Sequence, residues 1–269
     1  MPKSLFISHG APDLVIAGTK ATEFLKDYGR RWKTDSKPDA IVMVSAHFET
    51  DLPTIVADPQ PDMIYDFGGF DPILRTLTYP APGSPEIAGR VAEALQNASI
   101  EHAVMEKRGF DHGVWVPLML MLPDAEIPVV QLSVQPNRDA AWHIELGRAL
   151  APLTEDNILV VGSGSLTHNL SELFQNGLPA RDSVMPEWVE QFADWTHAKL
   201  AENDFKALSN YRERAPHAAR NHPTEEHLHP LFVAMAAASG HSNEKDLNAD
   251  RIHASAEFGV LAMDAYAFG

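Results

Sequence analysis

The stretch ILVVGSGSLTHNL, residues 158–170, decides the fold that this sequence predicts. It opens with four consecutive aliphatic residues and continues through a glycine-rich segment to His168. Continuous hydrophobicity without alternation is typical of a strand buried on both faces of a mostly parallel sheet. Two other apolar runs lead to a histidine in the same way, LFISHG to His9 and AIVMVSAH to His47. The sequence therefore predicts three buried strands that each end near an imidazole.

Strand-like runs alternate with helical patterns along the 269 residues. Short apolar runs that predict strands lie at 5–8, 40–45, 128–134 and 158–161. Helical patterns begin after Ser84, span about 139–150, begin near Pro186 and follow Pro230. This alternation predicts an α/β fold, in which a central, mostly parallel or mixed sheet is flanked by helices. We expect one domain over residues 1–269, with the active site at the carboxyl ends of the strands.

Composition excludes several classes of function. The net charge is −16, from 21 basic and 37 acidic residues, so we expect neither a nucleic-acid partner nor binding to an anionic membrane. The chain has no cysteine, which excludes disulfides, thiolate metal sites and a cysteine nucleophile. No apolar run reaches the roughly 18 residues of a membrane-spanning helix, and the first residues lack a long apolar segment. The expected location is the cytoplasm.

The three strand-end histidines indicate a metal or catalytic site. If their strands are neighbours, His9, His47 and His168 converge in one crevice. Imidazole is the usual protein ligand for iron, zinc, copper and nickel, and histidines without cysteines suit a catalytic site better than a structural zinc site. Each histidine taken alone could be a hydrogen-bonded structural residue. The placement that they share favours a common site.

Other histidines are divided by their sequence context. The segment EEHLHPL, residues 225–231, offers further donors through its two glutamates, His227 and His229. His112 lies in GFDHG, where we expect a loop and a charge-assisted hydrogen bond to Asp111. The histidines interpreted as surface or packing residues are His102, His143, His197, His241 and His253.

The glycine-rich segment 162–165 allows other interpretations. A loop after a strand can bind phosphate, but GxxxxGK[ST] is absent and Thr167 occupies the third glycine position of GxGxxG. A serine nucleophile would call for GxSxG, which the segment does not complete. We expect instead a tight turn that brings the backbone close to a ligand and directs His168 inward.

Three further segments have distinct characters. Residues 57–83 are rich in proline, glycine and aromatic residues, and a loop of this length is expected to be functional. Residues 239–251 are polar and charged, which predicts a surface excursion. Residues 256–268 predict a closing strand.

Eight short motifs resemble those of a known enzyme family. They occur in order over about residues 3–265 and are similar to the DOPA-dioxygenase-like branch of the class III extradiol ring-cleavage dioxygenases, which are related to the protocatechuate 4,5-dioxygenase catalytic subunit. The motifs are SHGAP (8–12), SAHF (45–48), DFGGF (66–70), YPAPGSP (79–85), GFDHG (109–113), PVVQLS (128–133), GSGSLTHNL (162–170) and EHLHPLF (226–232).

The resemblance implies a non-haem metal, Fe(II) for ring cleavage, with Zn(II) as an alternative bound metal. His9, His47 and His227 match the metal-ligand positions. Glu226 precedes His227, so either of them could be the third ligand, and the histidine in this branch's motif favours His227. Better-known class III enzymes use two histidines and a glutamate, which leaves the ligand charge and the metal preference open.

The resemblance also implies roles for two more histidines. His168 matches the acid–base residue and could also approach the metal, and His112 matches a residue that faces substrate or oxygen. The implied reactants are O₂ and a small aromatic diol such as DOPA or caffeate. The alternatives are a zinc-dependent hydrolase and a non-catalytic binding protein on the same scaffold. The sequence leaves the oligomeric state open.

Overall fold

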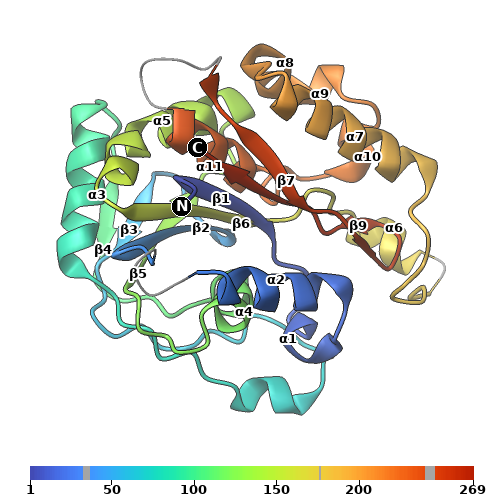
Figure 1. The fold of residues 1–269 in the computed structure, drawn as a ribbon, viewed down its shortest axis with the longest axis horizontal. Helices are drawn as coiled ribbons and strands as arrows, with labels where there is room; N and C mark the ends of the chain where they lie inside the picture. Colours follow the sequence, from blue (N-terminus) through green and yellow to red (C-terminus); the bar gives the residue numbers. More distant parts are fainter. Residues whose placement is uncertain (33–36, 176, 240–245) are drawn as a thin grey trace.

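A computed structural model describes residues 1–32, 37–175, 177–239 and 246–269 (Figure 1). Its centre is an eight-stranded sheet in the order β4-β3-β5-β2-β6-β1-β10-β7, and β8 and β9 form a separate two-stranded ribbon. The strands are β1 (Ser4–Ser8), β2 (Ala40–Glu49), β3 (Thr54–Val56), β4 (Ala103–Met105), β5 (Val129–Val134), β6 (Ile158–Gly164), β7 (Ala249–His253), β8 (Ala256–Glu257), β9 (Leu261–Ala262) and β10 (Ala265–Phe268).

The sheet is mixed, with a parallel centre. The four central strands, β5, β2, β6 and β1, run parallel to one another. On one side β10 is antiparallel to both β1 and β7, and on the other side β3 is antiparallel to β5. The four parallel strands are the four apolar runs that predict strands. The predicted fold class, a mostly parallel or mixed sheet flanked by helices, is confirmed.

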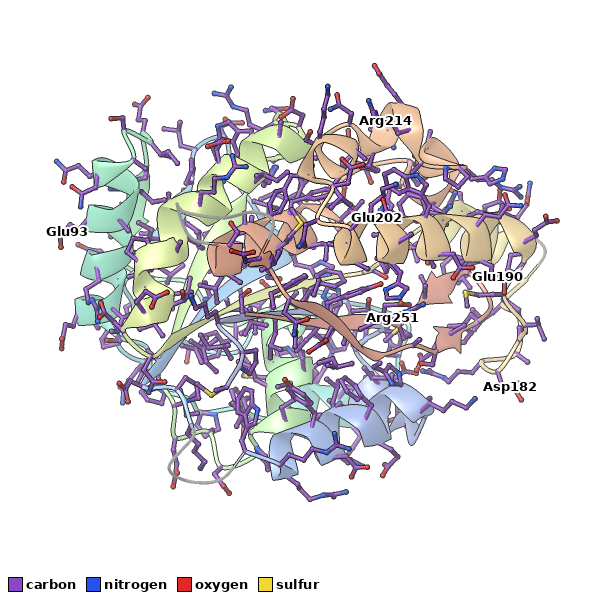
Figure 2. All side chains as sticks on the ribbon, turned by 45° about the horizontal axis from the view of Figure 1, so that its top comes forward. Glu93, Asp182, Glu190, Glu202, Arg214 and Arg251 are labelled. Atoms are coloured by element: carbon purple, nitrogen blue, oxygen red, sulfur yellow. The ribbon has the colours of Figure 1, made fainter. Side chains whose placement is uncertain are left out.

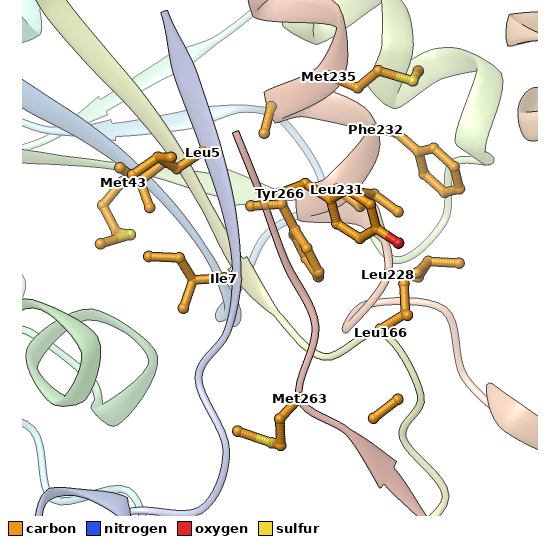
Figure 3. Close-up of a cluster of buried hydrophobic side chains, with 14 of the residues drawn as sticks. Leu5, Ile7, Met43, Leu166, Leu228, Leu231, Phe232, Met235, Met263 and Tyr266 are labelled. Carbon is orange, nitrogen blue, oxygen red and sulfur yellow. The ribbon is translucent and has the colours of Figure 1, made fainter. Parts of the chain in front are cut away.

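Alternate residues of the central strands face two different hydrophobic layers. Ile41 and Met43 of β2 belong to one buried cluster, and Val42 and Val44 belong to the other. All four side chains are fully buried, which explains why the strand reads as a continuous apolar run. Figure 3 shows part of the cluster that contains Met43, which includes side chains on both faces of the sheet, with Met43 on one and Phe232 on the other.

Helices cover both faces of the sheet (Figure 1). On one face lie α1 (Leu14–Ala17), α2 (Lys20–Arg30) and α4 (His112–Met121), and on the other α3 (Pro85–Asn97), α5 (Ala140–Glu155) and α11 (His229–Ser239). The remaining helices are η2 (Pro72–Thr76), α6 (Leu170–Phe174), α7 (Glu187–Ala201), α8 (Phe205–Ser209), α9 (Tyr211–Arg214) and α10 (Ala218–Asn221). The predicted helices correspond to α3, α5, α7 and α11. Ser84 caps α3 as expected, because its hydroxyl accepts a hydrogen bond from the backbone N–H of Ile87.

The predicted closing strand at 256–268 is partly wrong. Phe258 and Gly259 adopt left-handed conformations, with φ of 54° and 73°, and the chain turns between β8 and β9. Only β10 pairs with the central sheet, antiparallel to β1. Residues 240–245 of the predicted surface excursion at 239–251 lie outside the described residues, and its end belongs to β7.

Charged side chains project from the outer surface of the helices. Figure 2 shows Glu93 on α3 and Glu190 on α7, both of which are exposed. In the described part of the chain, no helix has both the length and the apolar character that a membrane crossing requires.

His143 is a buried residue of α5, and both of its ring nitrogens have partners. Nε2 accepts a hydrogen bond from the backbone N–H of Gln135 at 3.2 Å, so the neutral ring carries its proton on Nδ1, which donates to the carbonyl of Asp139 at 2.8 Å. Burial lowers the pKa of His143 to about 4. The interpretation of His143 as a packing residue is confirmed by this burial and by its stacking on His229, with ring centroids 3.8 Å apart.

Acid should destabilise the protein through His143. In the unfolded chain the pKa of a histidine is about 6.5, so between this value and 4 the unfolded state binds more protons. The stability that His143 contributes is complete above pH 6.5 and is lost as the pH falls toward 4, by about 2 kcal/mol at pH 5. We expect urea denaturation at pH 7 and pH 5 to show a smaller loss for His143→Gln than for wild type. The exposed His217→Asn is the control, and equal losses in all three proteins would contradict the assignment.

Candidate metal centre

Three neighbouring strands bring three histidines to one edge of the sheet. The order β2-β6-β1 places His47 near the end of β2, His9 directly after β1 and His168 shortly after β6. The Nε2 atoms of His9 and His47 lie 3.1 Å apart. The predicted convergence of strand-end imidazoles is therefore present in the structure.

Two more histidines from distant parts of the chain complete the cluster. The ring of His227 lies 5.5 Å from that of His9 and 4.9 Å from that of His47, measured between centroids, and it stacks on His168 at 3.5 Å. The ring of His112 lies 5.3 Å from His9 and 4.0 Å from His47. All five histidines that the sequence analysis assigned to the site lie together.

Two sets of donor atoms in this cluster are close enough to hold a metal ion. One comprises His9, His47 and His112, and the other His168, Glu226 and His227, with the donor atoms of each set within 4.8 Å of one another. The two sets adjoin, because His227 lies against both His47 and His168. The geometry thus offers more than one ligand set.

The glycines of the GSGS segment have a different role from the predicted one. Gly162 and Gly164 belong to strand β6 and do not form a turn. A Cβ on Gly162 would lie 2.1 Å from the carbonyl oxygen of Pro230, and one on Gly164 would lie 2.1 Å from that of His227. The expectation of a tight turn beside a ligand is therefore wrong. The glycines instead leave room for the backbone that carries His227. The Ser165 N–H donates a hydrogen bond of 2.9 Å to the carbonyl of His227 and holds this backbone in place.

Hydrogen bonds fix the tautomers of His9 and His227. The Ser163 hydroxyl donates to the Gly113 carbonyl, so it accepts from Nδ1 of His9 at 3.0 Å. Nδ1 of His227 donates to Oε1 of Glu226 at 2.8 Å. In both rings Nδ1 carries the proton, and Nε2 keeps the lone pair that a metal ion binds.

Asp66 orients the other two rings of the first donor set. Its carboxylate accepts a hydrogen bond from Nδ1 of His112 at 2.8 Å and lies 3.6 Å from Nδ1 of His47. Burial alone would raise the pKa of Asp66, but the hydrogen bond and charge of His112 and the proximity of His47 lower it to about 2. The sequence analysis assigned Asp66 no role. The signal was available, because DFGGF lies in the irregular segment that was expected to be functional.

The expected pairing of His112 with Asp111 in a loop is wrong. Asp111 is the N-cap of α4 and His112 is its first residue. The Asp111 carboxylate accepts hydrogen bonds from Ser45, the Val114 N–H and Arg108, so it faces away from the imidazole. Because the Asp111 carboxylate accepts a hydrogen bond from the first turn of α4, it does not pair with His112. The partner of His112 is Asp66.

The site imidazoles are held in the form that binds metal. Burial, followed by the neighbouring imidazoles, lowers the pKa of His9 and His227 well below 6.5. Burial also lowers the pKa of His47 and His168 to about 4. These rings are neutral at pH 7, and Nε2 of His9 and Nε2 of His227 each keep a lone pair that can bind a metal ion. This donor set fits a divalent transition metal.

The cluster lies in a cavity of about 850 Å³. Its inner part is lined by the five histidines and Asp66, and its outer part is mainly apolar. The irregular segment 57–83, which was expected to be functional, contributes residues 66–71 to the wall. A small organic molecule could therefore reach the imidazoles from solvent.

Several candidate donors lie elsewhere. His229 stacks on His143, and Glu225 accepts a hydrogen bond from the Tyr211 hydroxyl at 2.7 Å. His253 stacks on Phe24, which agrees with its interpretation as a packing residue. His241 lies outside the described residues.

Comparison with known proteins identifies the family. Residues 3–262 match the family described as the catalytic LigB subunit of aromatic ring-opening dioxygenase. The chain belongs to this family. The predicted resemblance is confirmed, and the enzyme class is that of the ring-cleaving dioxygenases, which are oxidoreductases.

Similar proteins support the same assignment over the whole length. The 4,5-DOPA dioxygenase extradiol of Beta vulgaris is 40% identical, covering 99% of this chain and 96% of the relative. The enzyme of the same name from Escherichia coli (strain K12) is 38% identical over 88% of this chain and 85% of the relative. A crystal structure of an uncharacterized protein from Escherichia coli K12 has a TM-score of 0.80 at 33% identity, covering 99% of each chain.

Gly164→Ala should disturb the centre without touching an imidazole. The added methyl group would lie 2.1 Å from the His227 carbonyl oxygen, so the segment that carries His227 has to move. We expect the affinity for Zn(II), measured by titration calorimetry on chelator-treated protein, to fall about 10- to 100-fold, as for lost outer-sphere support. The control is Gly89→Ala in α3, where a Cβ meets nothing within 4 Å and the helix should gain stability. Wild-type affinity in Gly164→Ala would contradict this role.

Proposed function

We propose that this chain is a metal-dependent extradiol dioxygenase that cleaves the ring of a small catechol with O₂, and that residues 1–269 form its catalytic domain. The observation that supports this best is the convergence of neutral imidazoles at the inner end of one cavity, in a member of the ring-opening dioxygenase family. DOPA appears in the names of relatives, so the panel to test includes DOPA and caffeate, which carry a carboxylate, together with uncharged catechols. A cytoplasmic location stays a prediction.

The proposed metal ligands are His9, His47 and His227. The tautomers of His9 and His227 support this choice, since each presents an unprotonated Nε2. Glu226 accepts a hydrogen bond from Nδ1 of His227. This bond supports a role for Glu226 in orienting His227, with His227 as the metal ligand. Fe(II) held by these rings would supply the redox chemistry that a diol and triplet O₂ need, whereas Zn(II), which the same rings could bind, has no redox chemistry.

His168 is the proposed acid–base residue. A catechol must lose protons before its two oxygens can chelate a metal, and a later step must return a proton. Because the pKa of His168 is lowered to about 4, its ring is neutral at pH 7 and begins as the acceptor. The proton that a ring nitrogen takes from the diol is then the proton that it returns.

His112 is the proposed contact to oxygen or to a substrate hydroxyl. Its Nδ1 donates to Asp66, which fixes the plane of the ring against the cavity wall. Asp66 therefore positions His112 and, at 3.6 Å, also His47. In this arrangement the Asp66 carboxylate lies beside both a proposed metal ligand, His47, and the proposed substrate contact, His112.

Oxygen consumption tests the proposed activity. Protein loaded with Fe(II) and kept anaerobic before the assay should consume O₂ with at least one compound of a catechol panel and form a yellow ring-fission product. Zinc-loaded protein should consume none. His168→Gln should lower kcat by about 10²- to 10⁴-fold at unchanged iron content, because it removes the proton acceptor. Zinc-dependent hydrolysis without O₂ uptake would support the hydrolase alternative, and inactivity with the whole panel would refute the dioxygenase.

Metal binding distinguishes His227 from His112 as the third ligand beside His9 and His47. If His227 is the third ligand, His227→Gln should weaken Co(II) or Zn(II) binding by at least about 100-fold, while His112→Gln changes it by less than about tenfold. Equilibrium dialysis with metal analysis measures both variants. The reverse pattern would place His112 in the ligand set of His9 and His47 and exclude His227.

A further inference from the structure

The outer part of the cavity is an apolar chamber that continues from the histidine cluster to the surface. Phe67 and Phe70 contact each other edge to face, and Leu170, Phe174 and Leu178 also line the cavity. The last three and Phe70 are between 38% and 59% exposed, which is unusual for large apolar side chains. Such a cluster around a cavity mouth is typical of a surface that a ligand covers.

The size of the cavity shows that a bare catechol would leave most of it empty. About 850 Å³ lies in the upper part of the roughly 300–1,000 Å³ that proteins use for drug-sized ligands. A diol held at the imidazoles would occupy only the inner end. The remaining space is continuous with the reacting position, so a substituent on the ring would enter the apolar chamber.

The charges around the chamber disfavour an anion. The described lining contains three carboxylates, of Asp13, Asp66 and Asp71, against one guanidinium, that of Arg181. Arg181 is already engaged, because it donates to the carboxylates of both Asp13 and Glu257. A substrate carboxylate that approached Arg181 would meet two anions and one cation. The positive charge of a bound metal would act at the other end, on the diol oxygens.

We propose that this enzyme selects catechols whose ring substituent is uncharged and extended, with apolar or aromatic character, and that Phe174 and Leu178 hold this substituent while the Asp13–Arg181 pair excludes carboxylates. This inference rests on the proposed ring cleavage. It assigns the reacting end of the substrate to the histidines and its distal end to the apolar chamber. Phe174 and Leu178 are specificity-determining residues that touch only the distal end.

A matched series of substrates tests the selection. The series is 4-methylcatechol, 3,4-dihydroxyphenylpropionate, its methyl ester and its phenethyl ester, which share the reacting ring and differ in charge and apolar area. With Fe(II)-loaded wild type, kcat/KM from O₂ uptake should rise about 10- to 100-fold from the acid to the phenethyl ester, with the methyl ester between them. Equal values, or a preference for the acid, would overturn the proposal.

Variants at the chamber separate apolar contact from charge. Phe174→Ala and Leu178→Ala should raise KM for the phenethyl ester about tenfold and leave kcat/KM for 4-methylcatechol unchanged. Both side chains are more than half exposed, so their truncation should not unfold the protein. Val184→Ala is the matched control, since Val184 is 91% exposed and lies outside the cavity lining.

Releasing Arg181 should reverse the charge selection. In Asp13→Asn the guanidinium keeps only Glu257 as an anionic partner, so it can accept a substrate carboxylate. The ratio of kcat/KM for the acid to that for the methyl ester should rise about tenfold, whereas an unchanged ratio would refute the role of this pair.

Ligand binding to the metal-free protein tests the apolar chamber independently of ring cleavage. Calorimetric titration of metal-free protein with the phenethyl ester should give tighter binding than with the acid, and Phe174→Ala should weaken it. If no compound is cleaved, the dioxygenase proposal fails, and this titration alone decides the chamber proposal. Equal binding of acid and ester would then overturn it.

Discussion

The close approach of two backbones underlies the whole site. Strand β6 carries Gly162 and Gly164 where the first turn of α11 and the residues before it cross the strand. A Cβ on Gly162 would collide with the carbonyl oxygen of Pro230, and one on Gly164 with that of His227. The hydrogen bond from the Ser165 N–H to the His227 carbonyl closes the contact. Without this approach His227 could not reach imidazoles that follow β1 and β2. The two glycines therefore join a C-terminal element to an edge of the sheet that is otherwise built from N-terminal strands.

Hydrogen bonds on the outer side of the ring orient three of the site imidazoles. Ser163 holds His9, Glu226 holds His227, and Asp66 holds His112 and lies 3.6 Å from Nδ1 of His47. Because burial lowers the pKa of His47 and His227, neither ring is an imidazolium ion that balances a nearby carboxylate at pH 7. A divalent cation among the rings would balance the negative charge of these carboxylates. The hydrogen bonds that orient the rings and the local charge therefore both favour a metal ion at this place.

The sequence predicted the parts of the fold that depend on continuous burial. Strands β1, β2, β5 and β6 are long apolar runs, whereas β3 and β4 have three residues each and offer no periodic signal. Helix α4 was missed because HGVWVPLMLM is apolar on every face. The DFGGF segment marked the neighbourhood of Asp66, but its pairing with His112 and the role of Gly164 could not be predicted, since their partners lie far along the chain. The choice of His227 came from the family resemblance. The chemistry of its segment alone would allow Glu225 or His229 as a metal ligand equally well.

The two ends of the cavity divide chemistry from selection. Contacts to the distal substituent are made before and during ring opening alike, so they change the affinity for substrate more than the rate of the chemical step. In the proposed reaction the histidines act on atoms whose bonding changes, and Asp66 positions His112, so their geometry bears on that step. Members of one family can therefore share the inner constellation and differ in the ring substituent that they accept. A relative's name is thus better evidence for the reaction of this chain than for its substrate, and the apolar mouth with its neutralised arginine is the local evidence on that second question.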